Sequence, residues 1–212
     1  LGGGIVPGAV VLLAGEPGVG KSTLLLDVAA KAAAVSRERG DGPVLYVTGE
    51  ESVSQVRLRA ERIEAIDPAL LLAGETELGA LLGHVEAVGP SLLVVDSVQT
   101  IASTQVEGAA GGVTQVRAVA GALIAVAKER AIPVLLVGHV TKDGGIAGPR
   151  VLEHLVDVVC QFEGDRHARL RLLRAVKNRY GPTDEVGCFD LGERGIVGLA
   201  DPSGLFLSAA RS

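Results

Sequence analysis

The sequence GEPGVGKS at residues 15–22 determines how the rest of the chain is interpreted. It fits the polyphosphate-binding pattern of a glycine, four further residues, then Gly-Lys-Ser. The apolar run VVLLA at residues 10–14 predicts a buried strand before it, and residues 23–34 predict a helix after it. In such a strand–loop–helix unit, backbone N–H groups and a helix N-terminus converge on phosphate groups. The sequence therefore predicts a polyphosphate site here.

Each residue type in this loop has a physical role in phosphate binding. Glycines let the backbone bend, the ammonium of Lys21 can reach the β- and γ-phosphates, and the hydroxyl of Ser22 can hold Mg²⁺. The predicted nucleotide-binding residues of this segment are Gly15, Glu16, Pro17, Gly18, Val19, Gly20, Lys21, Ser22 and Thr23.

Composition limits the classes of protein to which the chain can belong. Its 212 residues are 48% hydrophobic, which indicates a folded domain with a substantial core. No run of about 18 apolar residues predicts a membrane span. The net charge of −5 argues against a strongly basic nucleic-acid binder, although a ring or groove can have a positive lining. Cys160 and Cys188 are far apart and form no CxxC motif, so reduced thiols and a cytoplasmic location are expected.

Apolar runs alternate with helical patterns through the first two thirds of the chain. A capping-box pattern, Ser52 with Gln55, predicts one helix start. Continuously apolar strands that alternate with helices predict a mainly parallel α/β sheet with helices on both faces, and the β-rich C-terminal part predicts an antiparallel extension. Within that part, alternation in RLRLLRAV predicts a strand with one solvent-facing side. The further predicted strands are residues 44–48, 69–74, 91–97, 133–138, 158–164, 168–176, 186–191, 195–200 and 204–208.

Three polar residues stand at the ends of predicted strands. The carboxylate of Asp96 lies where it can orient Mg²⁺ held by Ser22. Glu50 is the candidate for positioning the attacking water, whereas its neighbour Glu51 can instead serve the first turn of the next helix. His139 ends the fifth strand and is a candidate sensor of the γ-phosphate; a structural histidine at a strand end is the alternative.

Cations occur in three further places. Lys177 and Arg179 are two residues apart, and in an extended conformation they point the same way, as a polyphosphate would require. The alternative is an exposed hairpin with ordinary surface charge. Two glycine-rich loops, residues 103–112 and 142–150, are predicted at the nucleotide edge, and Lys142 and Arg150 in the second can touch nucleic-acid phosphates. Neither loop has an aromatic residue for base stacking, so plain surface loops are the alternative.

Five segments taken together resemble one known family. They occur in the order found in the central ATPase domain of the bacterial RadA (Sms) family: GEPGVGKSTLLL, YVTGEES, LLVVDSVQT, GHVTKDGGIAGPRVLEHLVD and KNRYG. The resemblance covers essentially the whole chain, and KNRYG is its most specific part, with Tyr180 where the family usually has phenylalanine. It implies a single RecA-like ATPase domain over residues 1–212 that uses ATP and Mg²⁺. The absence of methionine fits an excised domain without the zinc module and Lon-like domain expected of whole family members.

The resemblance also implies roles for individual residues. By similarity to DnaB-type helicases, Glu50 would activate water, and Lys177 and Arg179 would act on the ATP of a neighbouring subunit. That implies a homo-hexameric ring around single-stranded DNA, a RecA-type recombinase as partner, and the two glycine-rich loops facing DNA. We expect a DNA-stimulated motor that assists strand exchange or branch migration. The alternative is a non-motor mediator whose assembly is switched by ATP; a signalling ATPase or kinase would need a protein acceptor, which the sequence does not indicate.

Overall fold

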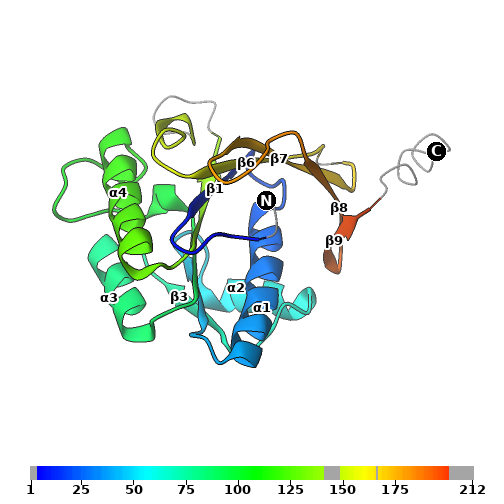
Figure 1. Ribbon diagram of the computed structural model, residues 1–212, viewed down its shortest axis with the longest axis horizontal. Helices are drawn as coiled ribbons and strands as arrows, with labels where there is room; N and C mark the ends of the chain where they lie inside the picture. The colour runs from blue at the N-terminus through cyan, green and yellow to red at the C-terminus, as the bar shows by residue number, and fades with distance from the viewer. Residues whose placement is uncertain (1–3, 141–148, 166, 201–212) are drawn as a thin grey trace.

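The computed structural model describes residues 4–140, 149–165 and 167–200, and these form one layered α/β unit (Figure 1). Its sheet has the strand order β3-β2-β4-β5-β1-β6-β7-β8-β9. The first six in that order are parallel: β3 (Leu70–Gly74), β2 (Val44–Thr48), β4 (Leu92–Asp96), β5 (Val134–His139), β1 (Val10–Gly15) and β6 (Val158–Glu163).

The inner parallel strands are covered on both faces, as their continuous apolar sequences predict, whereas the edge strand β3 is only partly buried. Every residue of β1, β2 and β4 is buried. On one face, α1 (Lys21–Arg39) and α2 (Val53–Arg62) pack against alternate strand residues such as Leu13 and Tyr46. On the other, α3 (Leu78–Val88) and α4 (Val113–Arg130) pack against Leu12 and Val47 (Figure 1). Two short 3₁₀ turns complete these elements: η1 (Val98–Thr100) comes directly after β4, and η2 (Pro149–Val151) precedes β6.

The C-terminal strands extend the sheet in antiparallel fashion, as predicted. They are β7 (Leu170–Asn178), β8 (Val186–Gly192) and β9 (Gly195–Leu199). β8 and β9 lie beside α1 in Figure 1, and the rings of Phe162 and Phe189 meet edge to face with centroids 6.2 Å apart. The predicted strand at residues 204–208 lies outside the described residues.

The alternation in RLRLLRAV predicts a strand with one solvent-facing side, and β7 has such a side, on which Arg174 and Val176 are exposed. Arg171 does not lie on that side: it is only 4% exposed, because the start of β7 lies against the phosphate loop. No helix in the described part of the chain is long and apolar enough to cross a membrane.

Candidate nucleotide and metal site

The order of the parallel strands gathers the predicted site residues. β2, β4, β5 and β1 are consecutive in the sheet, and because they are parallel their carboxyl ends lie at one edge. Glu50 follows β2, Asp96 ends β4, His139 ends β5, and the phosphate loop follows β1. Four segments that are distant in sequence therefore meet at one edge.

The side chain of Lys21 folds back onto the phosphate loop. Its side chain is almost fully buried, and Nζ donates to the carbonyl oxygens of Gly15 at 2.7 Å and of Glu16 at 2.8 Å. Burial lowers the pKa of Lys21 from 10.5 to about 8, although the nearby carboxylates of Asp96, Glu50 and Glu16 oppose that change. An ammonium has three donors, so one remains for a phosphate oxygen.

The rest of the loop presents backbone to solvent. Glu16, Pro17 and Gly18 are exposed, whereas Val19 is buried and anchors the loop in the core. Gly15 is required by a close approach, because a Cβ there would lie 2.4 Å from the carbonyl oxygen of Phe162. Ser22 and Thr23 stand half-buried in the first turn of α1, where the helix N-terminus favours anions.

Asp96 is a buried carboxylate that lacks a full set of partners. The hydroxyl of Tyr46 donates to its Oδ2 at 2.7 Å, while its buried Oδ1 has no hydrogen-bond partner among the described residues. Burial and the adjacent Asp96 raise the pKa of Tyr46 well above 10, so the hydroxyl stays a donor. Mg²⁺ prefers oxygen ligands, and an unsatisfied carboxylate oxygen fits it. Asp96 and Ser22 are the residues that would hold the metal.

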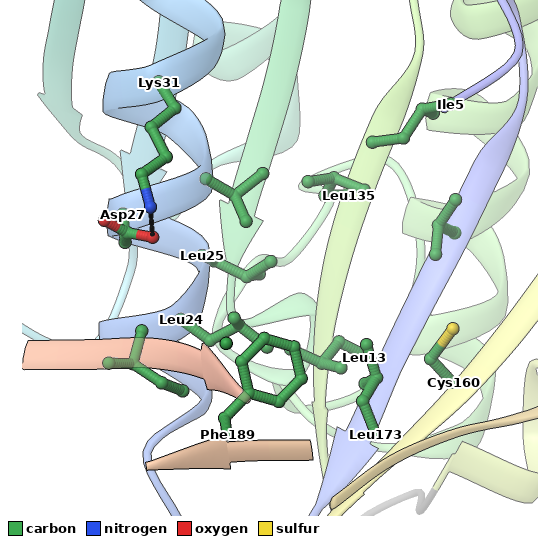
Figure 2. A pocket seen from close by; sticks show the side chains of 14 residues that line it. Ile5, Leu13, Leu24, Leu25, Asp27, Lys31, Leu135, Cys160, Leu173 and Phe189 are labelled. Atoms are coloured by element: carbon green, nitrogen blue, oxygen red, sulfur yellow. Dashed lines mark hydrogen bonds and ion pairs between the residues drawn. The ribbon is translucent and has the colours of Figure 1, made fainter. Parts of the chain in front are cut away.

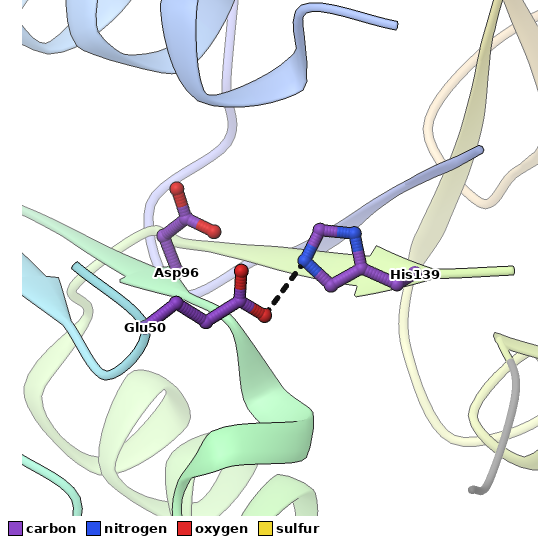
Figure 3. Close-up of side chains that lie close together, drawn as sticks. All are labelled: Glu50, Asp96 and His139. Atoms are coloured by element: carbon purple, nitrogen blue, oxygen red, sulfur yellow. Dashed lines mark ion pairs between the residues drawn. The ribbon is translucent and has the colours of Figure 1, made fainter. Parts of the chain in front are cut away.

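Glu50 is oriented by two contacts, of which Figure 3 shows the one with His139. Oε1 accepts a hydrogen bond from Ser97 Oγ at 2.7 Å and lies 2.9 Å from Nε2 of His139. The contact with His139 most of all, and that with Ser97, lower the pKa of Glu50 and keep its carboxylate ionised. Ligand atoms of Glu50, Asp96 and His139 all lie within 4.8 Å of one another. Oε2 of Glu50 has no partner in the part of the chain that the structure describes, so it can accept a proton of water.

Glu51 is held away from this cluster. Its Oε1 pairs with Arg59 at 2.5 Å, and its backbone N–H and C=O both bond to the hydroxyl of Thr48. Arg59 lies in the last turn of α2, so Glu51 joins that helix to Thr48 at the end of β2. These contacts favour Glu50 over Glu51 as the residue that faces the nucleotide.

Sequence reasoning missed three residues that support the site. Tyr46 and Ser97 position the two carboxylates, and Gln99 in η1 exchanges hydrogen bonds with the backbone of His139, at 3.1 and 3.3 Å. Ser97 and Gln99 directly follow the Asp96 motif, which was a usable signal. Tyr46 is 50 residues from its partner, and only the pairing of β2 with β4 reveals the contact.

Lys177 and Arg179 lie at the opposite edge of the sheet. β7 runs antiparallel to β6, with Asn178 opposite Val158, so the end of β7 is a strand length, roughly 17 Å, from the carboxyl edge. Lys177 donates to the carbonyls of Glu153 and Val156, each at 2.8 Å.

Arg179 contacts Asp157 at 3.1 Å, and the other oxygen of that buried carboxylate accepts from the N–H of Val10 at 2.9 Å. The two cations therefore share one short segment, residues 153–157, as their support. The structure does not bring them to the phosphate loop of their own chain.

The first glycine-rich loop follows η1 at the carboxyl edge, as expected. The side chain of Gln115, at the start of α4, bonds to the backbone of Ser103, Val106 and Gly108 and so ties the loop down. In the second loop, Lys142 lies outside the described residues, and Arg150 is exposed in η2.

A separate apolar cavity of about 380 Å³ lies between α1 and the C-terminal strands (Figure 2). Its lining includes Leu24, Leu135 and Phe189; the charged pair Asp27 and Lys31 is joined at 2.7 Å. Because this lining has no free charge for a phosphate, we do not assign the cavity to the nucleotide.

The chain is similar in sequence to known proteins. The model of a family described as AAA domain matches residues 1–145. The chain is 58% identical over 211 residues to the DNA repair protein RadA of Mycolicibacterium smegmatis and 50% identical over 207 residues to that of Streptococcus pneumoniae. In each case 98% of the chain is aligned, but it spans only 44% and 48% of those relatives.

Solved structures show the same fold at low sequence identity. A KaiC-like protein, PH0186 of Pyrococcus horikoshii, has a TM-score of 0.69 at 21% identity and covers 93% of this chain and 92% of its own. The RadB recombinase has a TM-score of 0.65 at 22% identity, and the alignment covers 92% of each chain. The predicted RecA-like α/β fold is thereby confirmed.

Proposed function

The chain belongs to the AAA domain family and to the bacterial RadA group of DNA repair proteins, and on that premise we propose that it is a Mg²⁺-dependent ATPase acting on single-stranded DNA in recombination and repair. The observation that carries the proposal is the convergence of Lys21, Asp96 and Glu50 at the carboxyl edge of the sheet. Phosphate binding, a metal-holding carboxylate and a water-positioning carboxylate are the parts that ATP hydrolysis requires.

The steps follow from the positions of these groups. Loop N–H groups and the third donor of Lys21 bind the phosphates. When bound, Mg²⁺ neutralises phosphate charge. Glu50, kept ionised by His139 and Ser97, accepts a proton of the attacking water through Oε2 and aligns it. Because His139 contacts Glu50 and precedes the second glycine-rich loop in sequence, it would pass a change at the γ-phosphate on to that loop.

A pair of adjacent glutamates provides the test of hydrolysis. Glu50→Gln removes the base without changing its size and should lower kcat by about a hundredfold or more while nucleotide still binds. The matched control, Glu51→Gln, alters a residue paired with Arg59 and should keep most of the turnover. If the control instead loses as much activity as Glu50→Gln, the assignment of the base is wrong; if Lys21→Ala retains full turnover, the whole site is wrong.

Lys177 and Arg179 would complete the site of a neighbouring subunit in a homo-hexameric ring. Support comes from their position: they lie too far from their own loop, yet at the edge that a head-to-tail neighbour would face. Mixing Arg179→Ala with Glu50→Ala should restore activity, because mixed interfaces then contain one complete site. Mixtures no more active than the separate variants would contradict action between subunits.

DNA would bind at the two glycine-rich loops, with a RecA-type recombinase as partner. Arg150 is exposed at the end of the second loop, and backbone phosphates are its expected ligand. Arg150→Ala should weaken binding of a labelled single strand and reduce the salt dependence of that binding, whereas Arg57→Ala on exposed α2 should not. A strand-displacement assay distinguishes a motor from the alternative. A motor should displace a paired strand, whereas a mediator whose assembly alone responds to ATP should not.

A further inference from the structure

Arg171 is a buried cation that the nucleotide site as described does not use. It is 4% exposed, and burial lowers the pKa of its guanidinium. No carboxylate lies within ion-pair distance of it in the described part of the chain. A buried charge is costly unless its donors are satisfied, and here carbonyl oxygens accept from Nε and Nη1. Such an arrangement suits a residue that orients backbone.

One of those carbonyls belongs to the phosphate loop. Nε of Arg171 donates to the carbonyl oxygen of Val19 at 2.7 Å, across 152 positions of sequence. Nη1 donates to the carbonyls of Asp165 and Ala168, in the turn between β6 and β7, and of Leu170, the first residue of β7, at 2.7–3.0 Å. The planar guanidinium therefore joins the phosphate loop to this turn and to the start of β7.

The Val19 carbonyl and the Gly20 N–H belong to one peptide group. In a planar trans peptide the C=O and the N–H point in opposite directions, so a donor that holds the Val19 oxygen aims the Gly20 N–H the other way. Gly20 has φ of 105°, a conformation that favours glycine, and a Cβ there would lie 2.9 Å from Leu191 of β8. The Gly20 N–H directly precedes Lys21, among the N–H groups that surround the bound phosphates.

The charge of Arg171 adds to this orientation. A hydrogen bond from a cation to a carbonyl polarises the whole peptide, and the N–H becomes a stronger donor. We propose that Arg171 is a positioning residue for phosphate binding, which aims and polarises the Gly20 N–H through the Val19 carbonyl. This proposal rests on the proposed function, because it needs a polyphosphate in the loop.

The test compares two arginines of the same strand. Arg171→Lys keeps a charge but loses the fork; the control, Arg174→Lys, alters an exposed residue that lies 3.6 Å from Glu163. We expect Arg171→Lys to raise the Kd for MgADP and the KM for ATP about tenfold, with kcat changed less than about twofold. The Kd for pyrophosphate should rise in the same proportion, because the phosphates carry the effect.

A second readout follows the peptide itself. The Gly20 amide proton of the wild type should shift downfield when pyrophosphate is added, and this shift should be smaller in Arg171→Lys but unchanged in Arg174→Lys. If Arg171→Lys does not fold, Arg171→Ala in millimolar guanidinium chloride is the substitute, and affinity should recover with added guanidinium. Equal Kd values and equal shifts for the two lysine variants would overturn the proposal. Failure of the wild type itself to bind MgADP would overturn the proposed function instead.

Discussion

Tyr46→Phe tests the metal-holding carboxylate most directly. The substitution removes a single hydroxyl, which donates to Oδ2 of Asp96 at 2.7 Å. The ring itself is 1% exposed and packs in the core between the sheet and α1, so phenylalanine keeps the packing. Because Oδ1 already lacks a partner among the described residues, the variant leaves a buried carboxylate without a hydrogen-bond donor there.

The size of the effect can be worked from these contacts. A hydrogen bond to a charged group contributes about 1.5–3 kcal/mol to the free energy of unfolding. In a domain of this length, each kcal/mol lowers the Tm by about 2–4 °C, so Tyr46→Phe should unfold about 3–12 °C below the wild type. With Asp96 no longer oriented, the concentration of Mg²⁺ needed for half-maximal ATPase activity should rise as well.

The chain offers its own control, because its other tyrosine is exposed. Tyr180 is 48% exposed, and Tyr180→Phe should change the free energy of unfolding by no more than about 0.5 kcal/mol. Thermal unfolding is followed with and without MgADP for both variants. In an Asp96→Asn background the loss caused by Tyr46→Phe should fall to about 1 kcal/mol, since a neutral acceptor replaces a charged one. Equal Tm values for Tyr46→Phe and Tyr180→Phe would refute this reasoning.

Three further predictions concern the ammonium, the histidine and the core. The pKa of Lys21 is about 8 in the folded protein and 10.5 ordinarily, so between these values the folded state binds fewer protons than the unfolded state. The free energy of unfolding of the wild type should therefore rise with pH across that range, by up to about 3 kcal/mol relative to Lys21→Ala. Denaturant titrations at pH 7.5 and 10 measure this difference, and a difference that stays constant would contradict the prediction. His139→Ala removes the largest cause of the lowered pKa of Glu50, so the acid limb of the kcat–pH profile should move to higher pH; an unmoved limb would show that the contact does not govern ionisation. Leu123→Ala should cost about 2–5 kcal/mol because the side chain is fully buried in α4, whereas Leu58→Ala, 66% exposed, should cost almost nothing in the same denaturant titration.

Local patterns predicted most of the elements because they contain their own signals. The strand predicted at residues 44–48 is β2, and the capping box of Ser52 with Gln55 begins α2 as expected. The first helix is longer than its apolar pattern: α1 continues through charged residues to Arg39 and ends where Gly40 adopts φ of 73°. That extension has no apolar periodicity, so the sequence pattern alone could not place its end.

The site was predictable where residues terminate strands and unpredictable where strands must first be paired. Asp96, Glu50 and His139 each end a recognisable apolar run, and strand ends share one edge whatever the strand order. The contacts of Tyr46 with Asp96 and of Arg171 with Val19 join residues 50 and 152 positions apart. They depend on which strands are neighbours, and that order, β3-β2-β4-β5-β1-β6, is not written in any local pattern.

The separation of the phosphate loop from Lys177 and Arg179, at opposite edges of the sheet, has a consequence for counting. If the cations of each subunit complete the ATP site of the next subunit, an isolated subunit has no complete ATP site, and an open row of subunits has one fewer complete site than it has subunits. Only in a closed ring is the number of complete sites equal to the number of subunits. Specific activity should therefore rise with protein concentration and level off once assemblies close, and each Arg179→Ala subunit mixed in should silence its neighbour while its own centre continues to turn over.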